Sequence, residues 1–125
     1  MSAASFRQLR IWEEAFSLAR EVYVLTRSFP KEELFGLTSQ VRRSANSVAA
    51  NIAEGSGRSS SRDYERFLFM ARGSARETMH HLLLAQTLDL MNQASTERLL
   101  TRYQGLDAGI HACIMGLKRT KRPML

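Results

Sequence analysis

Residues 37–58, LTSQVRRSANSVAANIAEGSGR, decide how this chain folds. At about 100° per residue, their apolar side chains fall on one side of a helix of roughly six turns. These side chains belong to Leu37, Val41, Ala45, Val48 and Ile52. A polar row occupies a separate arc beside them, and it consists of Gln40, Arg43, Ser47, Asn51 and Glu54. Short hydroxyl and amide side chains suit fixed hydrogen bonds, so the row predicts a specific contact rather than a solvated helix face.

Glu54 stands at the end of this row, next to Gly55, and its carboxylate has two interpretations. It could act as an acid or base beside a glycine-containing loop, or it could pair with a basic or amide group on a facing helix. Its place in the row favours the pairing. We call the row together with Gly55 the polar seam, and expect it to be buried and to specify the packing geometry more than it adds stability. Gly55 and Gly57 are expected to end the helix in left-handed conformations.

Turn signals divide the rest of the chain into three more helical segments. Pro30 ends the first segment, because proline disfavours helical backbone in the residue before it. Ser60 or Ser61 can cap the third helix and Ser95 the fourth. The expected helices span residues 7–29, 37–54, 61–90 and 96–118, within one domain of residues 1–125. Four such helices with short connections predict an all-α protein, an antiparallel up-down-up-down four-helix bundle.

The first helix carries more apolar surface than one bundle face needs. One stripe consists of Leu9, Trp12, Phe16, Ala19 and Tyr23. A second, adjacent stripe consists of Ile11, Ala15, Leu18, Val22, Leu25 and Phe29. Together they cover roughly half of the circumference, more than the ~100° stripe of a surface helix. We therefore expect this helix to pack both inside its own bundle and against another subunit.

The composition indicates a basic protein. Its 125 residues include 18 Lys and Arg against 12 Asp and Glu, a net charge of +6. A high positive charge favours contact with polyanions, chiefly nucleic acid. Residues 91–125 hold six basic and two acidic residues, and a solubilising C-terminal tail is the alternative explanation of this excess. The sequence has no long apolar run, no secretion signal and a single cysteine, so we expect a cytoplasmic protein without membrane contact.

Little in the sequence predicts catalysis or metal binding. His80 and His81 are adjacent, so on a helix they point about 100° apart and cannot share one site. No EXXH, HEXXH, CXXC or Walker motif occurs, and the GSGR of residues 55–58 follows no predicted strand. Cys113 lies on the apolar face of the fourth helix and is expected in the core. We therefore expect neither an enzyme nor a bound metal or cofactor.

The placement of basic residues suggests a nucleic-acid surface. The candidate binding residues are Arg58, Arg62, Arg66, Arg72 and Arg76 around the third helix, and Lys118, Arg119, Lys121 and Arg122 at the end of the fourth. The arginines could follow a phosphate backbone, and Phe69 among them could stack on a base. In the alternative interpretation, Phe69 is buried at a subunit contact, and the arginines pair with Glu65 and Glu77 or serve a protein interface.

The residues around the second helix closely resemble the signature of a bacterial family of small four-helix bundles, the proteins encoded by intervening sequences of 23S ribosomal RNA genes. The accessory variability proteins of diversity-generating retroelements are similar. The matching residues are Phe6 to Trp12, Phe29-Pro30, Glu33, Gly36-Leu37, Gln40, Arg42-Arg43, Ser47, Asn51 to Gly55, Phe67 to Ala71, Gly73-Ser74 and Glu77. The resemblance reaches to about Leu90, and the last helix matches only in pattern.

This resemblance implies a homopentamer, a ring of subunits without known catalytic activity. In the retroelement relatives, a basic pentamer of such bundles binds nucleic acid and a reverse transcriptase. For this chain we accordingly expect a non-enzymatic oligomeric binding or scaffold protein, with RNA or DNA as its expected partner. The alternative is a ring that binds a protein partner, such as a reverse transcriptase, and has no nucleic-acid role.

Overall fold

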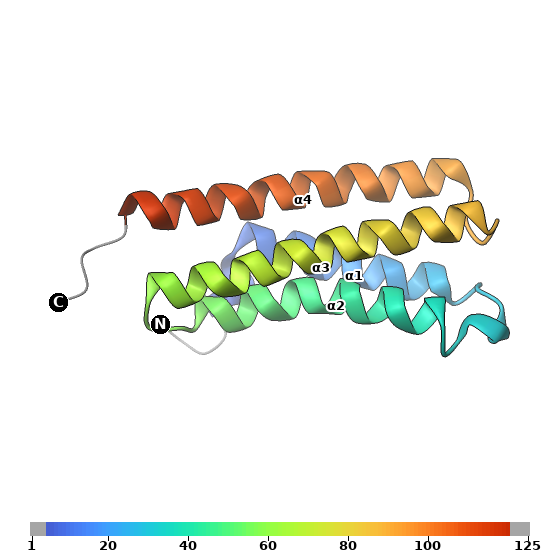
Figure 1. The fold of residues 1–125 in the computed structure, drawn as a ribbon, viewed down its shortest axis with the longest axis horizontal. Coiled ribbons are helices and arrows are strands. Elements are labelled where there is room, and N and C mark those ends of the chain that lie inside the picture. The colour runs from blue at the N-terminus through green and yellow to red at the C-terminus, as the bar shows by residue number, and fades with distance from the viewer. Residues whose placement is uncertain (1–4, 121–125) are drawn as a thin grey trace.

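The computed structural model of the chain describes residues 5–120 and is built of helices. Its four long helices are α1 (Arg10–Thr26), α2 (Leu37–Ser56), α3 (Ser61–Thr87) and α4 (Gln93–Thr120). Two short 3-10 helices, η1 (Ser5–Gln8) and η2 (Lys31–Glu33), precede α1 and α2. The long helices lie alongside one another and are joined at alternate ends (Figure 1). The predicted all-α, up-down-up-down bundle is therefore confirmed.

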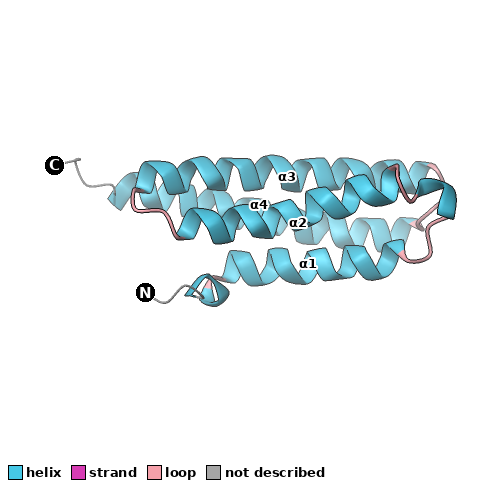
Figure 2. Ribbon diagram, turned by 90° about the horizontal axis from the view of Figure 1, so that it is seen from below, coloured by secondary structure: helices cyan, strands magenta, loops and turns pink. Residues whose placement is uncertain are grey.

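The order of the helices in the bundle determines which helix ends and loops lie at the same end of the molecule. Each long helix packs against its sequence neighbours and α1 also packs against α4, so α1 and α3 lie diagonally opposite. The start of α1, the α2–α3 loop and the end of α4 lie at the same end of the bundle (Figure 2). Within residues 5–120, no helix has the length and apolar character needed to cross a membrane.

The apolar faces of the four helices meet in one core, and α1 contributes only part of its apolar surface to it. On one stripe of α1, Leu18 and Val22 are fully buried. On the other stripe, the side chains of Phe16 and Tyr23 remain 47% and 44% exposed. The single bundle thus covers one stripe and leaves much of the second in contact with solvent.

The first helix is shorter at both ends than the sequence predicts. It begins at Arg10, because Leu9 before it has extended backbone. It ends at Thr26, whose hydroxyl donates to the Val22 carbonyl at 2.7 Å and accepts a hydrogen bond from Arg42 Nε at 2.8 Å. Residues 27–29 form a turn instead of a last helical turn. The helix thus ends one turn before Pro30, and the prediction that the proline ends it is wrong.

The second helix runs to Ser56, two residues beyond the predicted end. The prediction that Gly55 and Gly57 adopt left-handed backbone is wrong, since no glycine in residues 5–120 has a positive φ. Gly55 lies inside α2, where a Cβ would sit 2.6 Å from Cβ of Phe67. The glycine is therefore needed for the close approach of α2 and α3 rather than for ending the helix.

The third helix begins as predicted and ends earlier. The Ser60 hydroxyl accepts a hydrogen bond from the backbone N–H of Asp63 at 3.1 Å, which confirms a serine N-cap. The helix ends at Thr87 rather than at residue 90. Asp89 follows with φ of 60° and turns the chain toward α4. A left-handed aspartate is tolerated because its short polar side chain can bond locally.

The fourth helix is longer than the sequence predicts. The side chain of Asn92, and not that of Ser95, accepts the bond expected of a cap, from the Ser95 backbone N–H at 2.7 Å. The helix consequently begins at Gln93, three residues before the predicted start, and continues to Thr120. Its last turns lie beside the first turns of α3 (Figure 1), which is where the candidate nucleic-acid residues are concentrated.

Candidate nucleic-acid interface

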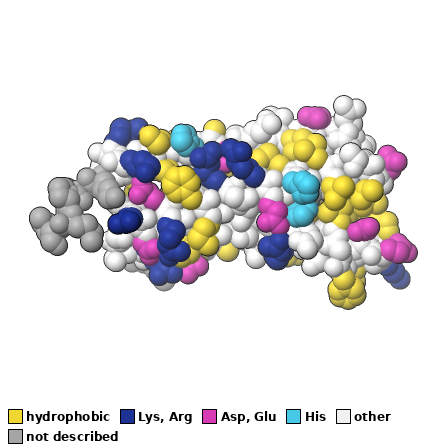
Figure 3. Space-filling view, viewed as in Figure 1, with side chains coloured by type: hydrophobic (Ala, Val, Ile, Leu, Met, Phe, Trp, Pro, Cys, Tyr) yellow, Lys and Arg dark blue, Asp and Glu magenta, His cyan; other side chains and the backbone are white. Residues whose placement is uncertain are grey.

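Lys and Arg side chains gather on one half of the surface formed by α3 and α4. In Figure 3 they occupy the half that contains the start of α3 and the end of α4. We call this the basic surface and define it by Arg58, Arg62, Arg66, Arg72, Arg76 and Lys118. The carboxylates paired with or bordering these residues are Glu54, Asp63, Glu65 and Asp107. Six cations against four carboxylates leave a net charge of +2.

Arg58 and Arg66 both lie against one aromatic ring, that of Phe67. Their guanidinium carbons lie 4.7 and 4.6 Å from the centroid of the Phe67 ring, within the range of cation–π attraction. Arg66 also donates two hydrogen bonds to Asp63 Oδ1, from Nη2 at 2.9 Å and from Nε at 3.1 Å. Arg58 pairs with Glu54 at 2.7 Å and approaches Asp63 at 3.7 Å. Both arginines are thus fixed in position, and their charges are largely compensated.

Arg72 and Arg76 converge on one carboxylate of α4. Arg72 donates to both oxygens of Asp107, from Nε at 2.9 Å and from Nη2 at 3.2 Å, and Arg76 approaches the same group at 3.5 Å. The hydrogen bond from Arg72 holds the pKa of Asp107 below its ordinary value, and the same bond raises the pKa of Arg72. The two arginines outnumber their shared carboxylate, so one positive charge stays uncompensated here.

Arg62 and Lys118 complete the basic surface. Arg62 is exposed, and among residues 5–120 it has no carboxylate within ion-pair distance. Lys118 reaches Oε1 of the buried Glu65 at 3.4 Å. Arg119, in the last turn of α4, is also exposed. The two remaining candidates, Lys121 and Arg122, lie outside the described residues.

The alternative pairing of the arginines with Glu65 and Glu77 is wrong. Glu65 is contacted by Lys118, and Glu77 by Arg43 of α2 at 2.5 Å and by His81 at 3.2 Å. The arginines of α3 use Asp63 and Asp107 instead. The sequence did offer a signal for Asp107, because it lies four residues after the buried Tyr103 and three before the buried Ile110, at the edge of a core face.

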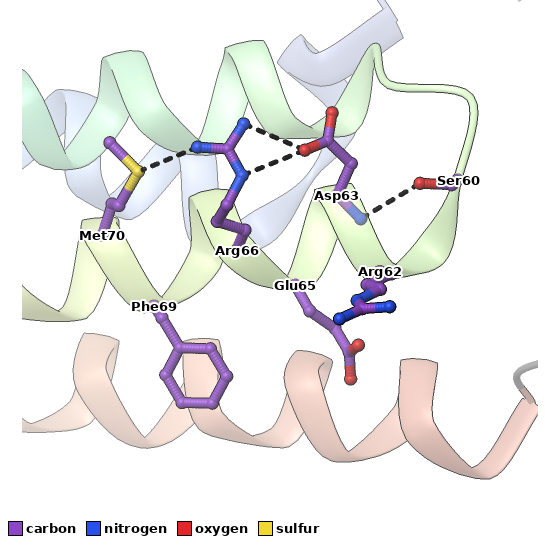
Figure 4. A pocket seen from close by; sticks show the side chains of 7 residues that line it. All are labelled: Ser60, Arg62, Asp63, Glu65, Arg66, Phe69 and Met70. Atoms are coloured by element: carbon purple, nitrogen blue, oxygen red, sulfur yellow. Dashed lines mark hydrogen bonds and ion pairs between the residues drawn. The ribbon is translucent and has the colours of Figure 1, made fainter.

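Phe69 and Met70 are apolar side chains exposed within this basic surface, at 50% and 45%. They line a shallow hollow of about 670 Å³ together with Arg62 and Arg66 (Figure 4). In the close-up, the Phe69 ring extends over α4 while Arg66 lies on the other side of α3, between Asp63 and Met70. Phe69 is therefore not buried within the subunit.

The polar seam lies along the contact between α2 and α3, but it is less buried than predicted. Ser47 accepts a hydrogen bond from Ser74 at 3.1 Å, and Arg43 reaches Glu77 across the two helices. Asn51 donates to its own helix, to the Ser47 carbonyl at 2.9 Å. Gln40, Arg43 and Glu54 are exposed. A fully buried polar contact between α2 and α3 lies outside the polar seam, at Ser44, the residue after Arg43. There the Thr78 hydroxyl donates to the Ser44 hydroxyl at 2.8 Å.

Glu54 does not pair across the bundle. Its partner Arg58 follows four residues later in the same chain segment, and 56% of the Glu54 side chain is exposed. An exposed pair of this kind contributes roughly 0.5 kcal/mol or less. The structural interpretation of Glu54 as a group that fixes the register of facing helices is thus corrected.

Two basic residues counted in the C-terminal excess belong to a different contact. Arg98 pairs with Glu21 at 2.8 Å, and Arg102 pairs with Glu14 at 2.6 Å and also with Glu21. The hydrogen bond that Arg102 donates to Glu14 raises the pKa of Arg102. These pairs join α4 to α1, so Arg98 and Arg102 are part of the bundle and not of a solubilising tail.

Residues with metal-binding chemistry are dispersed. Within residues 5–120 no three His, Cys, Asp or Glu side chains come together in a way that could hold a metal ion. The rings of His80 and His81 lie 5.3 Å apart at 64°. Cys113 packs against the core, and burial raises the pKa of its thiol.

Comparison with known proteins identifies a family and a similar solved structure. The family model described as 23S rRNA-intervening sequence protein matches residues 7–112. A crystal structure of a protein with unknown function from the S23 ribosomal protein family of Bacteroides thetaiotaomicron superimposes with a TM-score of 0.75 at 20% identity, over 83% of this chain and 97% of that chain. No curated protein matches the chain significantly. At 20% identity, the structural match supports a conclusion about the fold alone.

Proposed function

The chain belongs to the 23S rRNA-intervening sequence protein family, and from its surface we propose that it is a self-assembling, non-enzymatic protein that binds nucleic acid non-specifically. The observation that carries the proposal is the basic surface. On α3, Arg62, Arg66 and Arg76 follow one another along one side of the helix over roughly 21 Å, at 1.5 Å per residue. A row of this length can contact several phosphates of one strand, and such contacts carry no sequence information.

The ion pairs within the basic surface hold its guanidinium groups in place, although they compensate part of the positive charge. Bidentate and paired guanidinium groups lose less conformational freedom when they meet a phosphate, because they are already held in place. Arg72 is fixed by Asp107 with only 21% of its side chain exposed, whereas Arg62 stays uncompensated. The surface thus combines oriented donors with a residual positive charge that attracts polyanions.

Self-assembly is supported by the uncovered stripe of α1. Phe16 stacks on Trp12 with ring centroids 4.7 Å apart, and the guanidinium carbon of Arg42 lies 4.9 Å from the ring centroid of Tyr23. Such ordered aromatic side chains at an exposed surface are typical of protein interfaces. We propose that this stripe is a subunit contact, in a pentamer as the family resemblance implies.

The mass of the protein in solution tests the assembly. Sedimentation velocity of the unmodified chain should give one species of about 71 kDa, five times the chain mass of 14.2 kDa. A monomer at micromolar concentration would contradict self-assembly.

Charge reversal at Arg62 tests the binding surface. We expect Arg62→Glu to weaken retention of RNA or DNA in a filter-binding assay by about fivefold to tenfold, since it replaces a contact to phosphate by repulsion. The matched control is Arg27→Glu, at an exposed position near the other end of the bundle, which should change retention much less.

The mass of each variant separates the two functional alternatives. If Arg62→Glu breaks the oligomer while nucleic-acid retention stays as in the parent protein, the arginines serve subunit or partner contacts. Equal losses in the Arg62 and Arg27 variants would mean that binding follows net charge alone and that α3 is not the binding surface.

A further inference from the structure

Phe69 occupies an unusual position for an exposed aromatic side chain. It is half exposed and lies three residues from both Arg66 and Arg72, and seven residues from both Arg62 and Arg76. Residues at these helical spacings share one face. By helix position Phe69 therefore lies in the middle of the arginine row, and its ring extends toward α4 while the Arg66 guanidinium turns to the other side of α3 (Figure 4).

The hollow beside Phe69 combines an apolar lining with charged side chains. It is open to solvent, and its volume of about 670 Å³ falls within the range of ligand sites. Phe69 and Met70 supply its apolar surface, and Arg66 Nη1 lies 3.9 Å from the Met70 sulfur. A flat aromatic group could lie against the Phe69 ring, with Arg62 and Arg66 lining the same hollow as the nearest cations for charges attached to it.

Two arginines, Arg62 and Arg66, and two carboxylates, Asp63 and Glu65, line the hollow, and the wider basic surface around it carries a net charge of +2. A second copy of this chain would bring another protein of net charge +6 against a surface that is already positive. A nucleic-acid strand brings flat π-systems joined by phosphates, which matches a ring between arginines. A duplex does not fit equally well, because its bases are stacked inside the helix and do not present a free face.

We propose that the basic surface is a single-strand site in which Phe69 stacks on an unpaired base while the flanking arginines contact the adjacent phosphates. This inference rests on the proposed function and adds the form of nucleic acid that is bound. Because every base has a π-face, the site tolerates any sequence but discriminates against duplex.

Substitutions of Phe69 test the stacking directly. Binding of a fluorescent single strand of mixed sequence, and of the duplex formed with its complement, is measured by anisotropy. Phe69→Ala should weaken single-strand binding about five- to 150-fold, the range found for loss of one stacked base, and leave duplex binding nearly unchanged. Phe69→Trp should retain single-strand affinity, whereas Phe69→Leu, which keeps apolar bulk but has no π-face, should lose it. The control is Leu83→Ala, at 47% exposure on the same helix.

The outcomes distinguish this inference from the proposed function. If the parent protein binds neither form, the proposed function fails. If it binds both forms equally and Phe69→Ala changes neither, the single-strand inference is wrong while nucleic-acid binding stands. A loss with Phe69→Ala accompanied by a change in oligomer mass would overturn the inference, because Phe69 would then be a subunit contact. Retained single-strand affinity in Phe69→Leu would exclude stacking as the cause.

Discussion

Replacing Gly55 by valine is expected to lower the free energy of unfolding by about 3 kcal/mol, at the upper end of the cost of overpacking a core. A β-carbon at this position would lie 2.6 Å from Cβ of Phe67 and 3.1 Å from Cδ1 of Tyr64. Cβ of Phe67 is attached to the backbone of α3 and cannot move without that helix. The valine therefore has to push α2 and α3 apart at this contact.

The control for this prediction is the same substitution at Gly73. Nothing lies within 4 Å of a β-carbon built there, and valine has a slightly better helix propensity than glycine. Gly73→Val should consequently unfold at the denaturant concentration of the parent protein or slightly above it, as followed by circular dichroism. If Gly55→Val is as stable as Gly73→Val, the two helices do not approach as described.

Asp107→Asn is expected to lower stability by about 2 kcal/mol and at the same time to strengthen nucleic-acid binding. The carboxylate accepts two hydrogen bonds from Arg72, and 15% of the Asp107 side chain is exposed. Removing its charge leaves a partly buried guanidinium without compensation, a loss comparable to that of a hydrogen bond to a charged group. The same change raises the net charge of the basic surface from +2 to +3, which should tighten single-strand binding.

The pH dependence of this effect has a definite sign. The hydrogen bond from Arg72 lowers the pKa of Asp107 in the folded state, so the ionised form stabilises the fold at pH values above the ordinary pKa of about 3.9. That stabilisation is lost as the pH falls through the lower, folded-state pKa. The stability difference between the parent protein and Asp107→Asn should therefore be largest near neutral pH and smallest in strong acid. A difference that is independent of pH would contradict the ion pair, as would weaker nucleic-acid binding by Asp107→Asn.

Helix periodicity was sufficient to predict the fold, because the core of this bundle repeats at every third or fourth residue. The ends of the helices were predicted less well. Thr26 and Asn92 set two of them through side-chain bonds to the backbone or to another helix, and such bonds leave little trace in hydrophobic periodicity. Gly55 was predicted to end α2, but it is required by the close contact with α3. The sequence alone does not distinguish these two roles of a glycine.

The candidate interface could be predicted only in part. The arginine spacing correctly indicated an exposed side of α3. The net charge of that side also depends on two carboxylates, Asp63 on α3 and Asp107 on α4, and Asp107 lies 35 residues after its partner Arg72. Pairing between helices depends on their relative rotation and axial shift. The hydrophobic pattern of a single helix does not contain these quantities. The alternative that paired Glu65 and Glu77 with the arginines of α3 therefore named the wrong cations.

The central claim, that the basic surface binds nucleic acid through its phosphates, is tested most directly by the salt dependence of single-strand binding by the unmodified protein. The account predicts binding at micromolar protein in about 50 mM salt, with an affinity that falls linearly on a log–log plot as salt is raised toward about 200 mM. The slope should decrease in magnitude by about 1 in the Arg62→Glu protein. Absence of binding at the lower salt concentration, or an affinity that does not change with salt, would contradict the account.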